Sequence, residues 1–264
     1  MSDRVAAPSH PSAKGATVIV GGTSGIGLAT AELLAREGRA GIVLMGRNAE
    51  RGAAAVSAVA AVGSAVPGFR RVDAGDPSAV AEALSEVRDT HRHVDTVVCS
   101  TAADFRPELL HRCGPDEIVG ALRALTEPPL IVTHAALTLL REQGGGCIVT
   151  VASDAAKVPT PGEAAIGAAM AAIVMFSRVA ALEGKRDNVR VNVVTPSLVA
   201  GTPTSDALLA DGFSRRLFER AAERAELGIV VPQDVAELIA FLSSPRAAKI
   251  TGQVLSVNGG VSVA

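Results

Sequence analysis

The sequence predicts an α/β fold, a doubly wound parallel sheet of seven strands with helices on both faces. Seven short apolar, β-branched runs alternate with helical patterns along the 264 residues. The runs are continuously apolar, which is typical of strands that are covered on both faces. No linker or internal repeat interrupts the alternation. We therefore expect a single Rossmann-type domain over residues 14–264, after a flexible N-terminal tail of residues 1–13.

Each strand is expected where an apolar run stands between turn or helix signals. After the first run, GLATAELLAREG has apolar residues at helical spacing, and Gly38 is expected to end that helix in the left-handed conformation. The predicted strands are ATVIV (16–20), GIVLM (41–45), FRRVD (69–73), VDTVVC (94–99), CIVTVAS (147–153), VRVNVVT (189–195) and QVLSVN (253–258).

Composition argues against several function classes. A net charge of −2 gives no electrostatic reason to bind nucleic acid or an anionic membrane. The three cysteines form no CxxC pair and the histidines have no metal-ligand spacing, so we expect a cytoplasmic protein without disulfides or a metal. The longest apolar run, 164–176, has 13 residues. A membrane span needs roughly 20, so no membrane partner is expected.

A glycine-rich turn connects the first strand to the first helix. Gly21, Gly25 and Gly27 form a GxxxGxG loop that opens onto the helix. Glycines let the backbone approach a pyrophosphate, and the helix N-terminus offers free N–H groups and a partial positive charge. The strand–loop–helix context therefore predicts a dinucleotide site.

Gly46 and Arg47 follow the second predicted strand, about where a dinucleotide fold recognises the adenosine ribose. A small residue leaves room for a 2′-phosphate, and a guanidinium can bind it with two hydrogen bonds. This pair predicts NADP(H) as the cofactor.

These motifs resemble the short-chain dehydrogenase/reductase family from about residue 14 to the C-terminus. The matching segments are VGGTSGIG, RVDAGD, VRVNVVTPSLVAGTP, PQDVAELIAFLSSP and ITGQVLSVNGG. The resemblance implies that residues 73–74 contact the adenine, that the glycine loop holds the phosphates and that residues 196–202 embrace the nicotinamide. The candidate cofactor-binding residues are Gly21, Thr23, Ser24, Gly25, Ile26, Gly27, Arg47, Asp73, Ala74, Ser100, Pro196, Val199 and Thr202.

The family's catalytic residues are matched only in part. Ser153 occupies the position of the serine that orients the substrate carbonyl, but the tyrosine and lysine of the YxxxK pair correspond to Ile166 and Met170. The sequence contains no tyrosine at all. The stretch PGEAAIGAAMAAIVMF (161–176) has one charged residue and is expected to exchange no proton. The stretch occupies the position of the family's catalytic helix, but it has the apolar composition of a helix buried in a core.

A different proton donor would then be needed. Asp154 is a candidate if burial raises its pKa, although a loop-capping role is an equal alternative. Lys157 is expected to be solvent-exposed. His111 and Asp104, after the fourth strand, are weaker candidates.

Three functions remain open from the sequence. The first is an NADP(H)-dependent oxidoreductase with a displaced acid, which reduces a carbonyl or an activated enone or enoyl small molecule. The second is a non-redox dehydratase, isomerase or cyclase, and the third is a cofactor-binding protein without activity.

Residues 205–227 are expected to form a substrate lid, where Arg215 and Arg216 could meet an anionic group. The alanines and Gly167 of the stretch 161–176 permit close helix packing. As in the family, we expect this helix to pack against its counterpart in another copy, in a homodimer or homotetramer.

Overall fold

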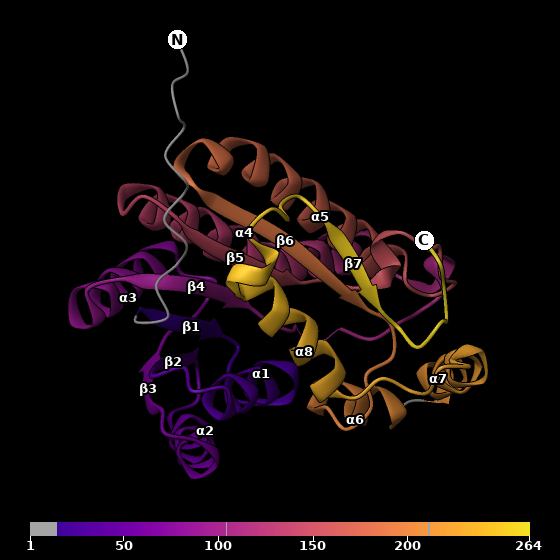
Figure 1. Ribbon diagram of the computed structural model, residues 1–264. Helices are drawn as coiled ribbons and strands as arrows, with labels where there is room; N and C mark the ends of the chain where they lie inside the picture. The colour runs from indigo at the N-terminus through magenta and orange to yellow at the C-terminus, as the bar shows by residue number, and fades with distance from the viewer. Residues whose placement is uncertain (1–14, 104, 211) are drawn as a thin grey trace.

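The computed structural model describes residues 15–103, 105–210 and 212–264. It confirms the predicted fold class, with seven parallel strands in the order β3-β2-β1-β4-β5-β6-β7 (Figure 1). The predicted tail, 1–13, lies outside the described residues. The strands are β1 Ala16–Val20, β2 Gly41–Gly46, β3 Val66–Arg71, β4 Val94–Cys99, β5 Gly146–Val151, β6 Val189–Pro196 and β7 Val254–Val257.

Helices cover both faces of the sheet (Figure 1). One apolar core joins α3, α4 and the end of α5 to the sheet, and a second joins α1, α2 and α8 to its other face. The α-helices are α1 Gly25–Arg36, α2 Ala49–Val62, α3 Pro77–His91, α4 Pro115–Glu142, α5 Ala164–Gly184, α6 Pro203–Leu209, α7 Gly212–Arg224 and α8 Pro232–Ser243. The described part of the chain also forms the 3₁₀ turns η1 Leu110–Arg112, η2 Asp154–Ala156, η3 Lys185–Asp187 and η4 Pro245–Ala247.

The third strand is the one whose position differs most from the prediction. It spans Val66–Arg71, whereas 69–73 was expected. Pro67 and Gly68 argue against a strand by propensity, but β3 is at the edge of the sheet, where the missing N–H of a proline leaves no ladder bond unmade. The predicted left-handed conformation at the end of α1 is confirmed, since Gly38 has a φ of +84°.

Helix α5 continues beyond the 13-residue apolar run, to Gly184. Residues 164–187 have a mean hydropathy of 1.9 over an 18-residue window, so this helix is long and apolar enough to cross a membrane by length and composition alone. Only 39% of that window is buried. Its buried residues, among them Ile173, Val174 and Ala181, pack in the core clusters beside the sheet.

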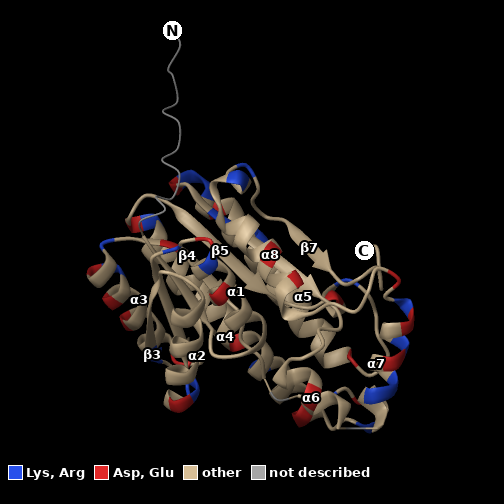
Figure 2. Cartoon of the chain, turned by 60° about the horizontal axis from the view of Figure 1, so that its bottom comes forward, with Lys and Arg blue, Asp and Glu red and all other residues tan. Residues whose placement is uncertain are grey.

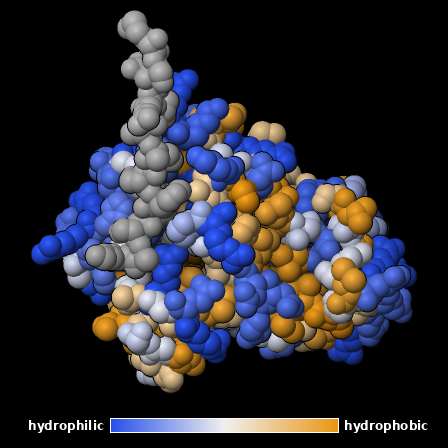
Figure 3. Space-filling model, viewed as in Figure 1, coloured by the Kyte–Doolittle hydropathy of each residue, from blue (hydrophilic) through white to orange (hydrophobic). Residues whose placement is uncertain are grey.

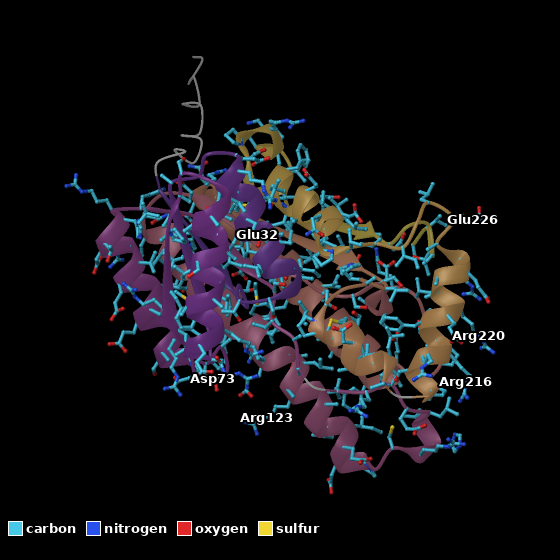
Figure 4. The ribbon with its side chains drawn as sticks, turned by 90° about the horizontal axis from the view of Figure 1, so that it is seen from below. Glu32, Asp73, Arg123, Arg216, Arg220 and Glu226 are labelled. Atoms are coloured by element: carbon cyan, nitrogen blue, oxygen red, sulfur yellow. The ribbon has the colours of Figure 1, made fainter. Side chains whose placement is uncertain are left out.

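The predicted lid, 205–227, falls in the connection between β6 and α8. It is built from α6 and α7, and Asp211 between them lies outside the described residues. Acidic and basic residues lie along α7, whereas the central strands carry few charged residues (Figure 2). Arg216 and Arg220 project outward from α7 (Figure 4).

Candidate active site

The site is built at the carboxyl edge of the sheet, where β1 and β4 are neighbours although they are far apart in sequence. Gly21 follows β1 with a φ of +81°. A Cβ at Gly21 would lie 2.3 Å from the carbonyl oxygen of Ser100, and a Cβ at Gly27 would lie 2.3 Å from that of Gly21. The backbones of the glycine loop and the end of β4 therefore touch, which only glycine permits.

The N-terminus of α1 fits a phosphate group. Its N-cap residue, Ser24, makes no side-chain capping hydrogen bond. By contrast, Asn48 and Asp76 cap α2 and α3 with side-chain oxygens. The first-turn N–H groups of α1 are thus left for an anion, as a dinucleotide pyrophosphate requires.

Two arginines meet at the ends of β2 and β3. Arg47 is exposed, and its carbonyl oxygen accepts a hydrogen bond of 3.1 Å from Nε of Arg71. Gly46 pairs with Arg71 in the strand register, which brings the two side chains to the same rim. Sequence reasoning named Arg47 but missed Arg71, because the strand it ends was misplaced. Asp73 lies at the rim beyond β3 (Figure 4), and its Oδ1 accepts from the backbone N–H of Gly75 at 3.0 Å.

The segment after β6 closes over the glycine loop. Val199 forms a β-bridge with Val230, and Thr202 caps α6 by accepting from the N–H of Ser205 at 3.0 Å. A Cβ at Gly25 would lie 3.5 Å from Cγ2 of Thr202, which is ordinary van der Waals contact. The fold thus brings together the glycine loop and part of the 196–202 segment that the resemblance assigned to the nicotinamide end.

Ser153 follows β5 and begins η2. Its Oγ accepts a hydrogen bond of 3.2 Å from the N–H of Ala155. The side chain is partly exposed, so the hydroxyl hydrogen remains available to a bound oxygen.

Asp154 is the centre of a buried polar network. Its carboxylate accepts from Ser256 at 2.8 Å, from Ser262 at 3.1 Å and from the side-chain amide of Asn258, and it pairs with Lys157 at 3.3 Å. The network joins the end of β5 to the end of β7 and the segment after it. Asp154 itself is 4% exposed.

The hypothesis that the pKa of Asp154 is raised overall, which a role as proton donor requires, is wrong. Burial does raise it, and this is the largest single effect, but hydrogen bonds from Asn258, Ser256 and Thr195 and the charge of Lys157 together hold the pKa below its ordinary value of 3.8. Asp154 is therefore an ionised acceptor at neutral pH and is unsuited to donate a proton. The expectation that Lys157 is solvent-exposed is also wrong, since its side chain is 18% exposed and bonds to Asp154 and Ser256.

Ile166 and Met170 lie on α5 at the site edge of the fold. Met170 packs against a small core cluster that includes Ala152, Ile173 and Val193, so its side chain fills space between α5 and the sheet. Gly167 has a role within the chain, besides the helix–helix contact expected of it. A Cβ there would lie 2.9 Å from the carbonyl oxygen of Ala155, so this glycine lets the loop after β5 rest on α5.

The start of α5 holds a titratable group that sequence reasoning dismissed. Glu163, the N-cap of α5, has a raised pKa because burial outweighs the opposing hydrogen bond with Thr160. Glu163, Lys157 and Thr160 line a groove of about 540 Å³ between the β5–α5 loop and α5. The signal in the sequence was the lone acid in an apolar stretch, but its burial depends on tertiary packing.

The remaining candidates are not part of this arrangement. His111 is exposed on η1, and Asp104 lies outside the described residues. Among residues 15–103, 105–210 and 212–264, no group of three or more His, Cys, Asp or Glu side chains is placed to hold a metal ion.

Comparison with known proteins agrees with this geometry. A family model described as enoyl-(acyl carrier protein) reductase matches residues 20–262. The 3-oxoacyl-[acyl-carrier-protein] reductase FabG of Escherichia coli is 31% identical over 244 residues, which cover 92% of this chain and 96% of that protein.

Two solved structures extend the comparison to bound cofactors. The 3-ketoacyl-(acyl-carrier-protein) reductase of Brucella melitensis, complexed with NADH, superposes with a TM-score of 0.82 at 25% identity and covers 94% of this chain and 98% of its own. A variant actinorhodin polyketide ketoreductase with NADPH gives a TM-score of 0.84 at 25% identity, with 95% and 98% covered. The chain belongs to the short-chain dehydrogenase/reductase family of oxidoreductases.

Proposed function

We propose that the protein is an NADP(H)-dependent reductase that acts on the carbonyl of a 3-oxoacyl thioester or a related activated small molecule. The observation that carries the proposal is the cradle formed by the glycine loop, Ser100 and the unfilled N-terminus of α1, with Arg47 and Arg71 at its adenosine end. Several of the relatives are named 3-oxoacyl-[acyl-carrier-protein] reductases, and two structural neighbours hold nicotinamide cofactors.

Different residues along the carboxyl edge of the sheet would bind the cofactor and orient the substrate. The first turn of α1 binds the pyrophosphate, and the two arginines bind the 2′-phosphate. The segment 196–202 covers the nicotinamide, which supplies hydride when it is bound. Ser153 donates a hydrogen bond from its hydroxyl group to the substrate oxygen. Because Ile166 and Met170 stand at the positions of the family's tyrosine and lysine, the active site is non-standard. Carbonyls activated by a neighbouring thioester or by conjugation are therefore favoured over simple ketones.

Cofactor choice gives the first test. With acetoacetyl-CoA as the oxidant, the wild-type protein should consume NADPH faster than NADH and bind it more tightly. Arg47→Asp should weaken NADPH binding roughly 10–100-fold, since a charged hydrogen-bonded contact contributes about 1.5–3 kcal/mol. NADH binding should change little.

Isothermal titration calorimetry measures both constants. The matched control is Arg186→Asp, an exposed arginine on η3 at the opposite edge of the sheet. Equal affinity of the wild type for NADPH and NADH would contradict the role of Arg47. Failure of the wild type to oxidise NADPH with any carbonyl would contradict the proposed activity itself.

We also propose that the protein assembles with copies of itself through α5. Met175, Val179 and Leu182 are 58%, 46% and 62% exposed and follow one stripe of α5 at helical spacing. The edge strand β7 leaves a second unpaired surface, and apolar atoms are exposed along β7 and α8 (Figure 3). A second copy would cover the stripe, and a further pairing along β7 would give a tetramer.

Met175→Asp is expected to shift the protein to a smaller species in sedimentation velocity, because a charge would be buried in the apolar contact. Val66→Asp, at an apolar residue that is 80% exposed on the opposite edge strand, should leave the assembly unchanged. A wild type that sediments as a monomer at micromolar concentration would contradict the proposal.

A further inference from the structure

We propose that Glu163 is the catalytic acid of this protein, the group that gives the proton to the substrate oxygen. The inference rests on the proposed carbonyl reduction and identifies the donor that this reaction needs. No tyrosine exists in the chain, Asp154 is held ionised and Lys157 is bound to Asp154 and Ser256. Glu163 is the remaining titratable side chain of the groove.

The first argument is helical spacing. Glu163, the N-cap residue just before α5, precedes Ile166 by three residues and Met170 by seven, so it lies at the start of the stripe of α5 that carries these two residues. It stands at the end of α5 that faces the carboxyl edge of the sheet, one turn beyond Ile166. A carboxyl at this point extends the stripe that borders the reaction site.

The second argument is enclosure. The turn before Glu163 is clamped by two other segments of the site. The carbonyl oxygen of Gly162 accepts from the N–H of Glu108 at 2.9 Å, and a Cβ at Gly162 would lie 2.6 Å from the ring of Phe213 on α7. The loop after β4, the loop after β5 and the lid therefore converge at this turn, as they must around a substrate.

The third argument is charge. Burial raises the pKa of Glu163, which favours the protonated form that a general acid needs. The neighbouring charges do not reverse this. On the β5–α5 loop, Lys157 is neutralised by Asp154 at 3.3 Å, and in the segment after β4, Glu108 lies 3.9 Å from Arg112. On the remaining elements, Arg123 pairs with Glu127 within α4, Arg215 donates to the carbonyl of Leu209, and Arg216 and Arg220 project outward from α7 (Figure 4).

The proposed step reduces a carbonyl group to a hydroxyl group. The carbonyl carbon accepts a hydride from the reduced nicotinamide cofactor, and the π electron pair of the C=O bond moves onto the oxygen. That oxygen takes the proton of the Glu163 carboxyl and becomes a hydroxyl. The carboxylate that remains regains a proton from water through the groove, which is lined by Thr160 and the small residues Gly167 and Ala168.

The test uses NADPH oxidation by the full-length protein with acetoacetyl-CoA. Glu163→Gln keeps the shape of the side chain but cannot donate a carboxyl proton, and kcat should fall roughly 10²–10⁴-fold with an unchanged NADPH dissociation constant. Glu163→Ala should be equally slow, and added formate or acetate should restore its rate in proportion to the undissociated acid. Glu117→Gln, at an exposed carboxylate on α4 that accepts from the N–H of Gly114 at 2.8 Å, is the matched control, because an amide oxygen can keep that bond, and it should retain wild-type kcat.

The outcomes are distinguishable. A Glu163→Gln protein with wild-type kcat would overturn the inference, and so would an Ala variant that no small acid rescues. Either result leaves the proposed reductase in place as long as the wild type turns over. If the wild type itself does not reduce the thioester with NADPH, the proposed function is what fails.

Discussion

Asp154→Ala is expected to lower the free energy of unfolding by about 3–5 kcal/mol, the usual cost of removing one partner of a buried ion pair. Asp154 is 4% exposed, and loss of its carboxylate leaves Lys157 without a counter-charge, Ser262 without the carboxylate acceptor of its hydroxyl and Asn258 with one acceptor fewer. Urea unfolding followed by circular dichroism measures the change. Asp154→Asn/Lys157→Met removes both charges and should recover part of the loss, which distinguishes the ion pair from simple packing.

The same carboxylate predicts how stability depends on pH. Its pKa is lowered in the folded protein, so its contribution is complete above the ordinary value of 3.8 and is lost as the pH falls through the lower folded value. The wild type should therefore lose stability more steeply than Asp154→Asn in this acid range. Parallel acid titrations of the two proteins would contradict an ionised, bonded Asp154.

Gly21→Ala is expected to combine the second largest loss of stability with a loss of cofactor binding. The residue has a φ of +81°, which disfavours any side chain, and the added Cβ would lie 2.3 Å from the carbonyl oxygen of Ser100. The backbone has little room to move, because the N–H of Gly21 donates to Met45 at 2.9 Å and that of Ser100 donates to Val20 at 2.8 Å. Calorimetry and NADPH titration measure both effects.

Gly38→Ala provides the matched control. Gly38 has a φ of +84°, yet nothing lies within 4 Å of a Cβ at this position. Its substitution should cost only the left-handed conformation, about 1–2 kcal/mol, without affecting the cofactor. Gly21→Ala should add about 1–3 kcal/mol for overpacking. If both variants lose the same stability, the contact between the glycine loop and β4 is looser than the structure shows.

Most of the fold could be predicted from sequence because local patterns decide it. The alternation of apolar runs and helical stretches specified the parallel sheet, and the first strand, first helix and glycine loop lie where they were expected. The third strand was misplaced because its pairing with β2 at an edge overrides the poor propensity of Pro67 and Gly68. Because the third strand was misplaced, the position of Arg71 at its end was not predicted either.

The electrostatics of the site could not be predicted in this way. Asp154 and Ser256 are 102 residues apart, so no local pattern shows that this carboxylate is bonded rather than merely buried. The same holds for Lys157, whose partners include a residue on β7. Glu163 was dismissed as an ordinary charge in an apolar stretch, because its desolvation arises from loops that are distant in sequence. Ionisation follows from tertiary neighbours, and these become visible only in the folded chain.

The network around Asp154 also has a consequence for the order of events during synthesis. Asp154 and Lys157 leave the ribosome about a hundred residues before Ser256 and Asn258, and β7 is the last strand of the sheet. A nascent chain that ends before β7 therefore exposes an ion pair that lacks the hydrogen bonds from Ser256 and Asn258, at the carboxyl edge of the sheet. The loop after β5 gains these hydrogen bonds only when the final strand docks. Early release of a truncated chain should yield a species that binds cofactor poorly and is degraded quickly, since the glycine loop would form first and the opposite wall of the site last.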